Sequence, residues 1–100
     1  MSAYVIASYD IVDAEGYEPY VPGVLPLLEK HGAEIVVADF DAEALEGERR
    51  SVYVVLRFPS AESARNWHAD PAYEPLKKVR WESCARNDIV LAEEFVPPES

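Results

Sequence analysis

The order in which strand-like and helix-like patterns follow one another constrains this chain more than any single motif. Four stretches have the residues of β-strands, namely 3–10 (AYVIASYD), 33–40 (AEIVVADF), 51–58 (SVYVVLRF) and 88–95 (DIVLAEEF). Two further stretches, about 19–30 and 61–85, carry apolar residues three and four positions apart, which predicts amphipathic helices. The predicted order is therefore β-α-β-β-α-β. Residues 13–16 between the first strand and the first helix are turn-like. Alternation along 3–10 places Val5, Ala7 and Tyr9 on one face of that strand and Tyr4, Ile6 and Ser8 on the other.

Several residues mark where these elements begin and end. Gly32 stands where a left-handed cap would end the first helix, and Pro26 is expected to distort that helix. Ser60 is a suitable N-cap for the second helix, and Asp70 followed by Pro71 is expected to restart it. The loop between 33–40 and 51–58 contains the turn residue Gly47, so these two strands are predicted to form a long antiparallel hairpin.

Short connections and right-handed crossovers leave one common arrangement for this order. It is an α+β ferredoxin-like sandwich, with a four-stranded antiparallel sheet and two helices on one face. The strands are also apolar on the face that the helices leave open, and a second copy of the sheet is the simplest cover for it. We therefore expect residues 1–96 to form a single domain that pairs as a homodimer through its sheet faces, followed by a tail at 97–100.

Composition excludes several classes of function. The formal net charge of −10 opposes binding to nucleic acid or to anionic membrane surfaces. Cys84 is the single cysteine, so neither an intramolecular disulfide nor a cysteine-based zinc site is expected. The N-terminus shows no signal-peptide pattern, and no apolar run approaches the ~18 residues of a membrane span. A cytoplasmic acidic protein is the expectation.

The chain resembles the domain-of-unknown-function 1330 family (DUF1330) of the dimeric α/β barrel superfamily. The matching stretches span 3–94: AYVIASYDIVD at the start, Tyr20, LLEKHGA, LEG at 45–47, FPS at 58–60, and the pattern Ala64, Trp67, Pro71, Tyr73 and Arg80. The resemblance implies two sheets that close face to face into a barrel. Relatives in the wider superfamily include cofactor-independent monooxygenases, small-molecule isomerases and haem enzymes, so the fold alone does not select an activity.

Six residues are candidates for binding a ligand: Tyr20, His31, Glu46, Trp67, His68 and Arg80. The simpler interpretation of His31 is a cation that caps the end of the first helix, and His68 is expected at a helix edge. Glu46 and Arg80 have the charges of an anion clamp, or of a structural ion pair that holds the hairpin against the second helix. The aromatic residues would line a cleft if one opens between helices and sheet, and otherwise they only fill the core.

No pattern indicates a metal site or a cofactor, and neither is predicted. Two functions stay open at this point. One is a homodimer that binds a small organic molecule, with or without the activity of a cofactor-independent enzyme of the oxygenase or isomerase type. The alternative is a non-catalytic structural or regulatory dimer, which would need no pocket between its helices and its sheet.

Overall fold

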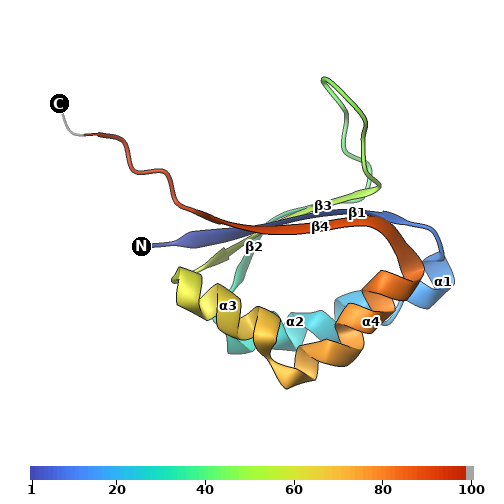
Figure 1. The fold of residues 1–100 in the computed structure, drawn as a ribbon, viewed down its shortest axis with the longest axis horizontal. Coiled ribbons are helices and arrows are strands. Elements are labelled where there is room, and N and C mark those ends of the chain that lie inside the picture. The colour runs from blue at the N-terminus through green and yellow to red at the C-terminus, as the bar shows by residue number, and fades with distance from the viewer. Residues whose placement is uncertain (99–100) are drawn as a thin grey trace.

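The computed structural model describes residues 1–98, and its central feature is one antiparallel sheet. Strands β1 (Ala3–Ile11), β2 (Glu34–Asp39), β3 (Val52–Phe58) and β4 (Cys84–Glu93) lie in the order β2-β3-β1-β4. Helices α1 (Ala14–Tyr17), α2 (Tyr20–Lys30), α3 (Ala61–Ala69) and α4 (Glu74–Ser83) all lie on one side of this sheet (Figure 1). The predicted α+β ferredoxin-like fold is confirmed.

The core lies between the inner face of the sheet and the helices. Alternation along β1 turns Val5, Ala7 and Tyr9 inward, where they are buried. In the neighbouring strand, Leu56 and Phe58 face the same way, because the register pairs Val5 with Leu56. The predicted division of β1 into two faces is therefore correct, and it places one aromatic hydroxyl, that of Tyr9, inside the core.

Helix ends follow the predicted signals. The Ser60 hydroxyl accepts a hydrogen bond from the Ser63 amide at 3.1 Å and caps α3. The Asp70 carboxylate accepts one from the Ala72 amide at 2.9 Å, which starts the 3-10 turn Pro71–Tyr73 that leads into α4. Gly32 has a φ of 74°, the left-handed conformation expected just after α2.

Two predicted boundaries are wrong. The second helical segment ends at Ser83 rather than near 85, and β4 begins at Cys84 rather than at 88. The reason is that β1 continues to Ile11 and pairs with Cys84, so that the start of β4 is held by long-range strand pairing. The turn expected at 13–16 is instead the short helix α1, capped by Asp13. The proposed tail at 97–100 includes 99–100, which lie outside the described residues, and its boundary stays a prediction.

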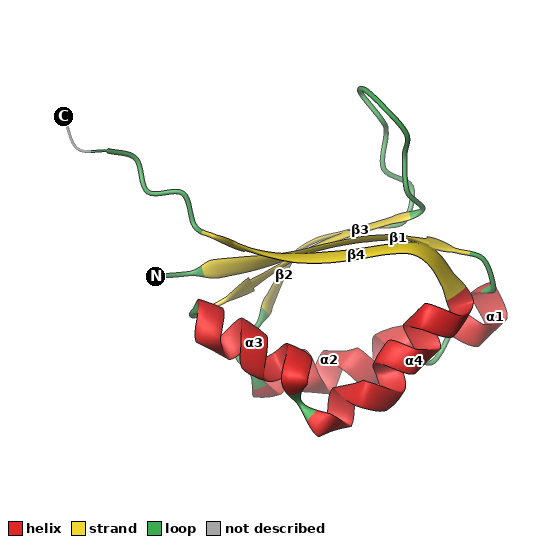
Figure 2. Ribbon diagram, in the orientation of Figure 1, coloured by secondary structure: helices red, strands yellow, loops and turns green. Residues whose placement is uncertain are grey.

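Among residues 1–98, no helix covers the opposite face of the sheet. The loop between β2 and β3 and the segment after β4 both leave the sheet on this open side (Figure 2). None of the helices formed by residues 1–98 has the length and apolar character that crossing a bilayer requires.

Candidate functional site

A cavity of about 100 Å³ lies between α2 and the inner face of the sheet. The aliphatic part of its wall includes Val5, Ala7, Val24, Leu28, Val54 and Leu56. Four aromatic residues complete the inner wall, namely Tyr9, Tyr17, Tyr20 and Trp67. The interface of helices and sheet is thus incompletely filled by the chain itself, and the space suits apolar atoms.

The cavity opens where the edge strand β2 meets α2. Leu25, Ile35 and Phe40 line it there, although they are 43%, 45% and 51% exposed. Large apolar side chains around an opening are costly in water unless something covers them. This rim therefore extends the apolar surface that a bound molecule would meet beyond the cavity itself.

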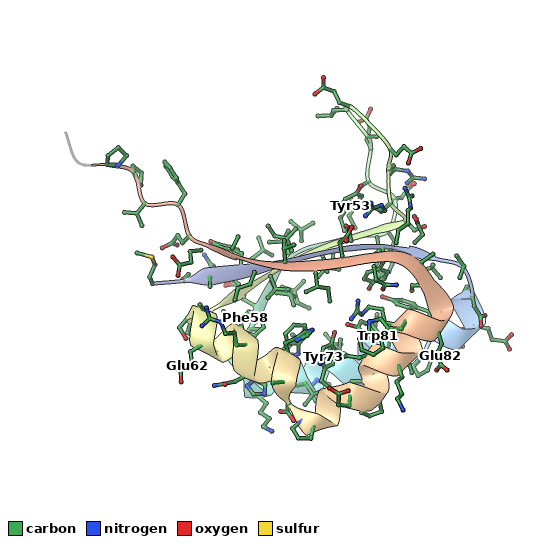
Figure 3. All side chains as sticks on the ribbon, in the orientation of Figure 1. Tyr53, Phe58, Glu62, Tyr73, Trp81 and Glu82 are labelled. Carbon is green, nitrogen blue, oxygen red and sulfur yellow. The ribbon has the colours of Figure 1, made fainter. Side chains whose placement is uncertain are left out.

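Three of the tyrosines that line the cavity take part in two pairs of hydrogen-bonded hydroxyls. The Tyr9 and Tyr17 hydroxyls lie 2.5 Å apart, and those of Tyr20 and Tyr73 lie 2.6 Å apart. Figure 3 shows Tyr73 between the helices and the sheet. Burial raises the pKa of Tyr9, Tyr17 and Tyr20 above the ordinary value, so these phenols keep their protons at neutral pH. They can donate hydrogen bonds, but they cannot serve as bases.

Trp67 separates this cavity from a second hollow on the other side of α3. The hollow is lined by Ala64, His68 and Leu91, and it shares Val5, Trp67 and Ile89 with the first cavity. Trp67 is 2% exposed, and its indole Nε1 has no hydrogen-bond partner among residues 1–98. A buried N–H without an acceptor costs about 1–3 kcal/mol, so an acceptor brought beside it would stabilise the protein.

His68 lies beside Trp67, with 6.1 Å between the two ring centres. Burial lowers the pKa of His68, and the positive charges of Lys77 and Arg80 lower it further. Its imidazole is therefore neutral at pH 7 and can accept a proton.

Arg80 is a buried cation without a counter-ion in the part of the chain that the structure describes. Its side chain is 2% exposed, and Nη1 donates to Asn87 Oδ1 at 3.2 Å. Nε has no partner among these residues, and no described carboxylate lies within ion-pair distance of the guanidinium. The guanidinium carbon lies 6.0 Å from the ring centre of Tyr9, which lines the cavity. An anionic group close to this wall would be stabilised electrostatically.

The predicted pair of Glu46 with Arg80 does not form within the protomer. Glu46 lies in the β2–β3 loop, which projects from the open face, whereas Arg80 lies under the sheet on α4 (Figure 1). The sheet thus separates the two charges, and both versions of the prediction, clamp and ion pair, are wrong for a single chain. The acidic residue Glu48 of the loop pairs instead with Arg86, at 3.1 Å.

His31 is also separate from the cavity. It is the C-cap residue of α2, and its Nε2 lies 2.8 Å from an Asp70 carboxylate oxygen that also accepts from Lys30 at 2.9 Å. These contacts join the end of α2 to the junction of α3 and α4. Of the six predicted residues, the structure thus brings Tyr20, Trp67, His68 and Arg80 to the cavity or its surroundings, and it places His31 and Glu46 elsewhere.

The sequence from residue 2 to residue 95 matches the family model described as domain of unknown function, DUF1330. The chain belongs to this family. No curated protein matches this DUF1330 chain in sequence.

Solved structures show that the fold recurs in proteins with little sequence similarity. A protein of unknown function from Rhodopseudomonas palustris, RPA0582, is 17% identical with a TM-score of 0.81, over 96% of this chain and 84% of that one. SnoaB, a cofactor-independent oxygenase from Streptomyces nogalater, is 12% identical with a TM-score of 0.66, over 99% and 95%. A dimeric protein of unknown function from Bacteroides fragilis, with a ferredoxin-like fold, is 13% identical with a TM-score of 0.57, over 93% and 96%. At these identities the likeness concerns the fold alone.

Sequence reasoning missed two residues of the DUF1330 site. Tyr9 was assigned to a face of β1 but not to the cavity, although alternation with Val5 and Ala7 was the signal that could have placed it there. Lys77 is 6% exposed and donates to Glu74 at 3.1 Å, and its spacing of four from Tyr73 and three from Arg80 was the signal that could have separated it from the exposed Lys78. No cluster of three or more histidine, cysteine or acidic side chains that could hold a metal ion occurs in the described residues.

Proposed function

We propose that this protein is a homodimer in which each protomer binds a small, mostly apolar organic molecule with a flat ring in the cavity beneath its sheet. The observation that carries the proposal is a cavity of about 100 Å³ that is lined by Trp67, whose buried indole N–H has no acceptor among residues 1–98. A dry cavity of ~150 Å³ binds benzene, so a cavity of about 100 Å³ that is open at its rim holds most of one ring. The rest of the molecule then lies against the apolar rim.

The polar groups favour a ligand that carries an oxygen atom. Trp67 would donate its indole N–H to that oxygen, and the nearby tyrosine hydroxyls would donate further hydrogen bonds. Arg80 would stabilise negative charge on the same molecule, since no described carboxylate neutralises it. A phenol, an enol or an aromatic carboxylate has this combination of a flat apolar body and an oxygen that can carry negative charge.

The same groups would support an enzyme that begins with proton removal. A ligand that extends past Trp67 into the second hollow would meet His68, which is neutral at pH 7 and can take a proton. Arg80 would then stabilise the enolate that results. Return of the proton at another carbon gives an isomerase, and capture of the carbanion by dioxygen gives a cofactor-independent oxygenase. SnoaB, described as such an oxygenase, has the same fold.

The homodimer is supported by the open face of the sheet. Val37, Val55, Ile6 and Val90 lie in one cross-strand row over all four strands. Ile6 and Val90 are 41% and 54% exposed, and polar residues such as the Arg57–Glu34 ion pair lie beside the row. An apolar centre with a polar rim is the usual composition of a protein interface. The Bacteroides fragilis protein of similar fold is described as dimeric.

The non-catalytic alternative has less support. It was expected to show a helix–sheet interface filled by side chains, and the cavity does not fit that expectation. A structural module also gives no reason for burying Arg80 without a counter-ion, because an unpaired buried charge is destabilising.

Binding can be tested with 2-naphthol and 2-naphthoate, which share a ring system and differ in charge. We expect both to bind, with 2-naphthoate preferred, as measured by isothermal titration calorimetry at pH 7. Trp67→Phe should weaken both by up to about tenfold, the worth of one hydrogen bond. Arg80→Met should weaken 2-naphthoate selectively, whereas Lys78→Met, which removes an exposed cation from the same helix, should change neither.

Two results would contradict the binding proposal. One is the failure of both probes to bind wild-type protein at millimolar concentration, together with native mass spectra that show no copurified small molecule. The other is equal weakening by Arg80→Met and Lys78→Met, which would mean that only the net charge matters.

A further inference from the structure

The loop between β2 and β3 has the features of an arm that reaches a second copy of the chain. We call residues 40–51 the arm. It leaves the sheet on the side opposite the helices, so it stands beside the open apolar face rather than over the protomer's own core (Figure 1). Tyr53, at its base, lies on the same open side (Figure 3) and accepts a hydrogen bond from the Arg50 amide at 2.9 Å.

The base of the arm is braced by ion pairs to the neighbouring strands β1 and β4. Arg86 donates to the Asp10 carboxylate, to Glu48 at 3.1 Å and to the Arg49 carbonyl at 3.1 Å. Its hydrogen bond lowers the pKa of the Asp10 carboxyl. Arg86 adopts a left-handed φ of 51° at this position, a conformation that costs free energy for a residue with a side chain. These hydrogen bonds and ion pairs therefore fix the direction in which the arm projects from the sheet.

A second arginine fixes the other side of the same base. Arg50 donates to Asp88 at 2.9 Å and to the Ser8 hydroxyl at 3.2 Å, which joins the arm to β4 and β1. Ordering a loop of this length costs conformational entropy, and Leu45 at the tip, which is 88% exposed, buries little surface in return.

The tip presents an apolar residue to solvent. Leu45 is 88% exposed, the largest exposure of any large hydrophobic residue among those described. The acidic residues Glu43, Glu46 and Glu48 surround it. A leucine at the end of an ordered, acidic loop can anchor that loop to an apolar surface of a partner. The surrounding charges keep the arm soluble until it binds.

The length of the arm fits a partner that packs on the open face. Each side of the arm has about six residues, and an extended chain advances ~3.3 Å per residue, so the tip can stand up to roughly 20 Å above the sheet. Face-to-face sheets lie ~10 Å apart. An arm of that reach would extend past the partner's sheet towards its helices.

We infer that the arm of each protomer clasps the flank of the other, with Leu45 packed against the partner's side chains. This inference rests on the homodimer of the proposed function and adds a second contact region, beyond the row of Ile6, Val55 and Val90. By two-fold symmetry each dimer would contain two such contacts.

The dimer dissociation constant tests this inference. Leu45→Asp should raise it by at least about a hundred-fold, because two buried leucines are lost per dimer. Val12→Asp places the same charge on an apolar residue that is 68% exposed, in the turn that descends from β1 towards the helices, and should leave the constant unchanged. Sedimentation velocity over a dilution series measures both, and circular dichroism checks that each variant is folded.

The possible results distinguish a failure of the arm inference from a failure of the homodimer proposal. If the wild-type protein is a dimer and Leu45→Asp leaves the dissociation constant unchanged, the inference about the arm is refuted and the homodimer proposal stands. A monomeric wild type would overturn both. A glutamate-specific protease gives a second measurement, because cleavage at Glu43, Glu46 and Glu48 should be slow in the dimer and fast in a monomeric Val55→Asp variant. Equal cleavage rates in the two would also contradict the arm.

Discussion

Adding side-chain volume at Ala7 should stabilise the protein, whereas the same change four residues earlier should destabilise it. Ala7 lines the cavity from the middle of β1. Ala3 lies on the same strand and the same inward face, is 1% exposed, and is not part of the cavity wall. Ala7→Met and Ala3→Met are therefore matched changes that differ in whether space exists to receive the new atoms.

The expected magnitude follows from the size of the cavity. Empty apolar space costs about 24 cal/mol per Å³, so a cavity of about 100 Å³ corresponds to roughly 2 kcal/mol of lost packing. Methionine adds three heavy atoms to alanine, and each buried methylene contributes about 0.8 kcal/mol. Since the fit of a flexible thioether is imperfect, we expect Ala7→Met to raise the free energy of unfolding by about 1–2 kcal/mol. Overpacking at Ala3 should lower it by about 1–3 kcal/mol.

Urea denaturation at one fixed protein concentration measures both changes, because the stability of a dimer depends on concentration. Calorimetry with 2-naphthol then shows whether Ala7→Met also blocks the cavity, where we expect at least a tenfold loss of affinity. A destabilisation by Ala7→Met as large as that by Ala3→Met would refute the reasoning, because it would mean that the space beneath β1 cannot receive a side chain.

Three further changes test the local structure around this core. Ser60→Ala should lower the free energy of unfolding by about 1 kcal/mol in urea denaturation, through loss of the α3 cap. Gly32→Ala should lower it by about 1–2 kcal/mol, because φ is 74° and a Cβ would lie 3.2 Å from Pro59 Cγ. Asp70→Asn should flatten the acid side of the stability–pH curve. Hydrogen bonds from His31 and the Ala72 amide lower the pKa of Asp70, so its contribution is complete above an ordinary aspartate pKa of ~4 and is lost as the pH falls below that. An unchanged acid limb in Asp70→Asn would contradict this role.

The fold was predictable because its signals are local and agree with one another. The alternation in β1 and β3, the cap at Ser60 and the left-handed glycine at 32 each specify one element. The boundary at Cys84 was not predictable, because its strand conformation comes from pairing with Ile11, some seventy residues away. Local periodicity contains no information on such a pairing.

The site was predictable only in part. Trp67 and Tyr20 could be placed on inward helix faces by their spacing, and both line the cavity. The prediction that Glu46 pairs with Arg80 was wrong, because residue type and family position do not indicate on which side of the sheet the β2–β3 loop projects. That direction depends on the arginines at positions 50 and 86, whose partners lie on other strands.

Three features at or near the cavity each lower the stability of the folded chain. Their occurrence in one small region is the strongest reason to regard the cavity as a binding site. An empty apolar volume, an indole N–H and an arginine Nε without partners in residues 1–98 each destabilise the folded chain. Native domains have only about 5–15 kcal/mol of stability in total, so several such costs in one small region are a substantial fraction. They also lie together, since Tyr9 both lines the cavity and contacts Arg80. A flat ring in the cavity would remove the first cost, and an anionic oxygen of the same molecule placed beside Trp67 or Arg80 would reduce the others, whereas any purely structural explanation must account for each of them separately.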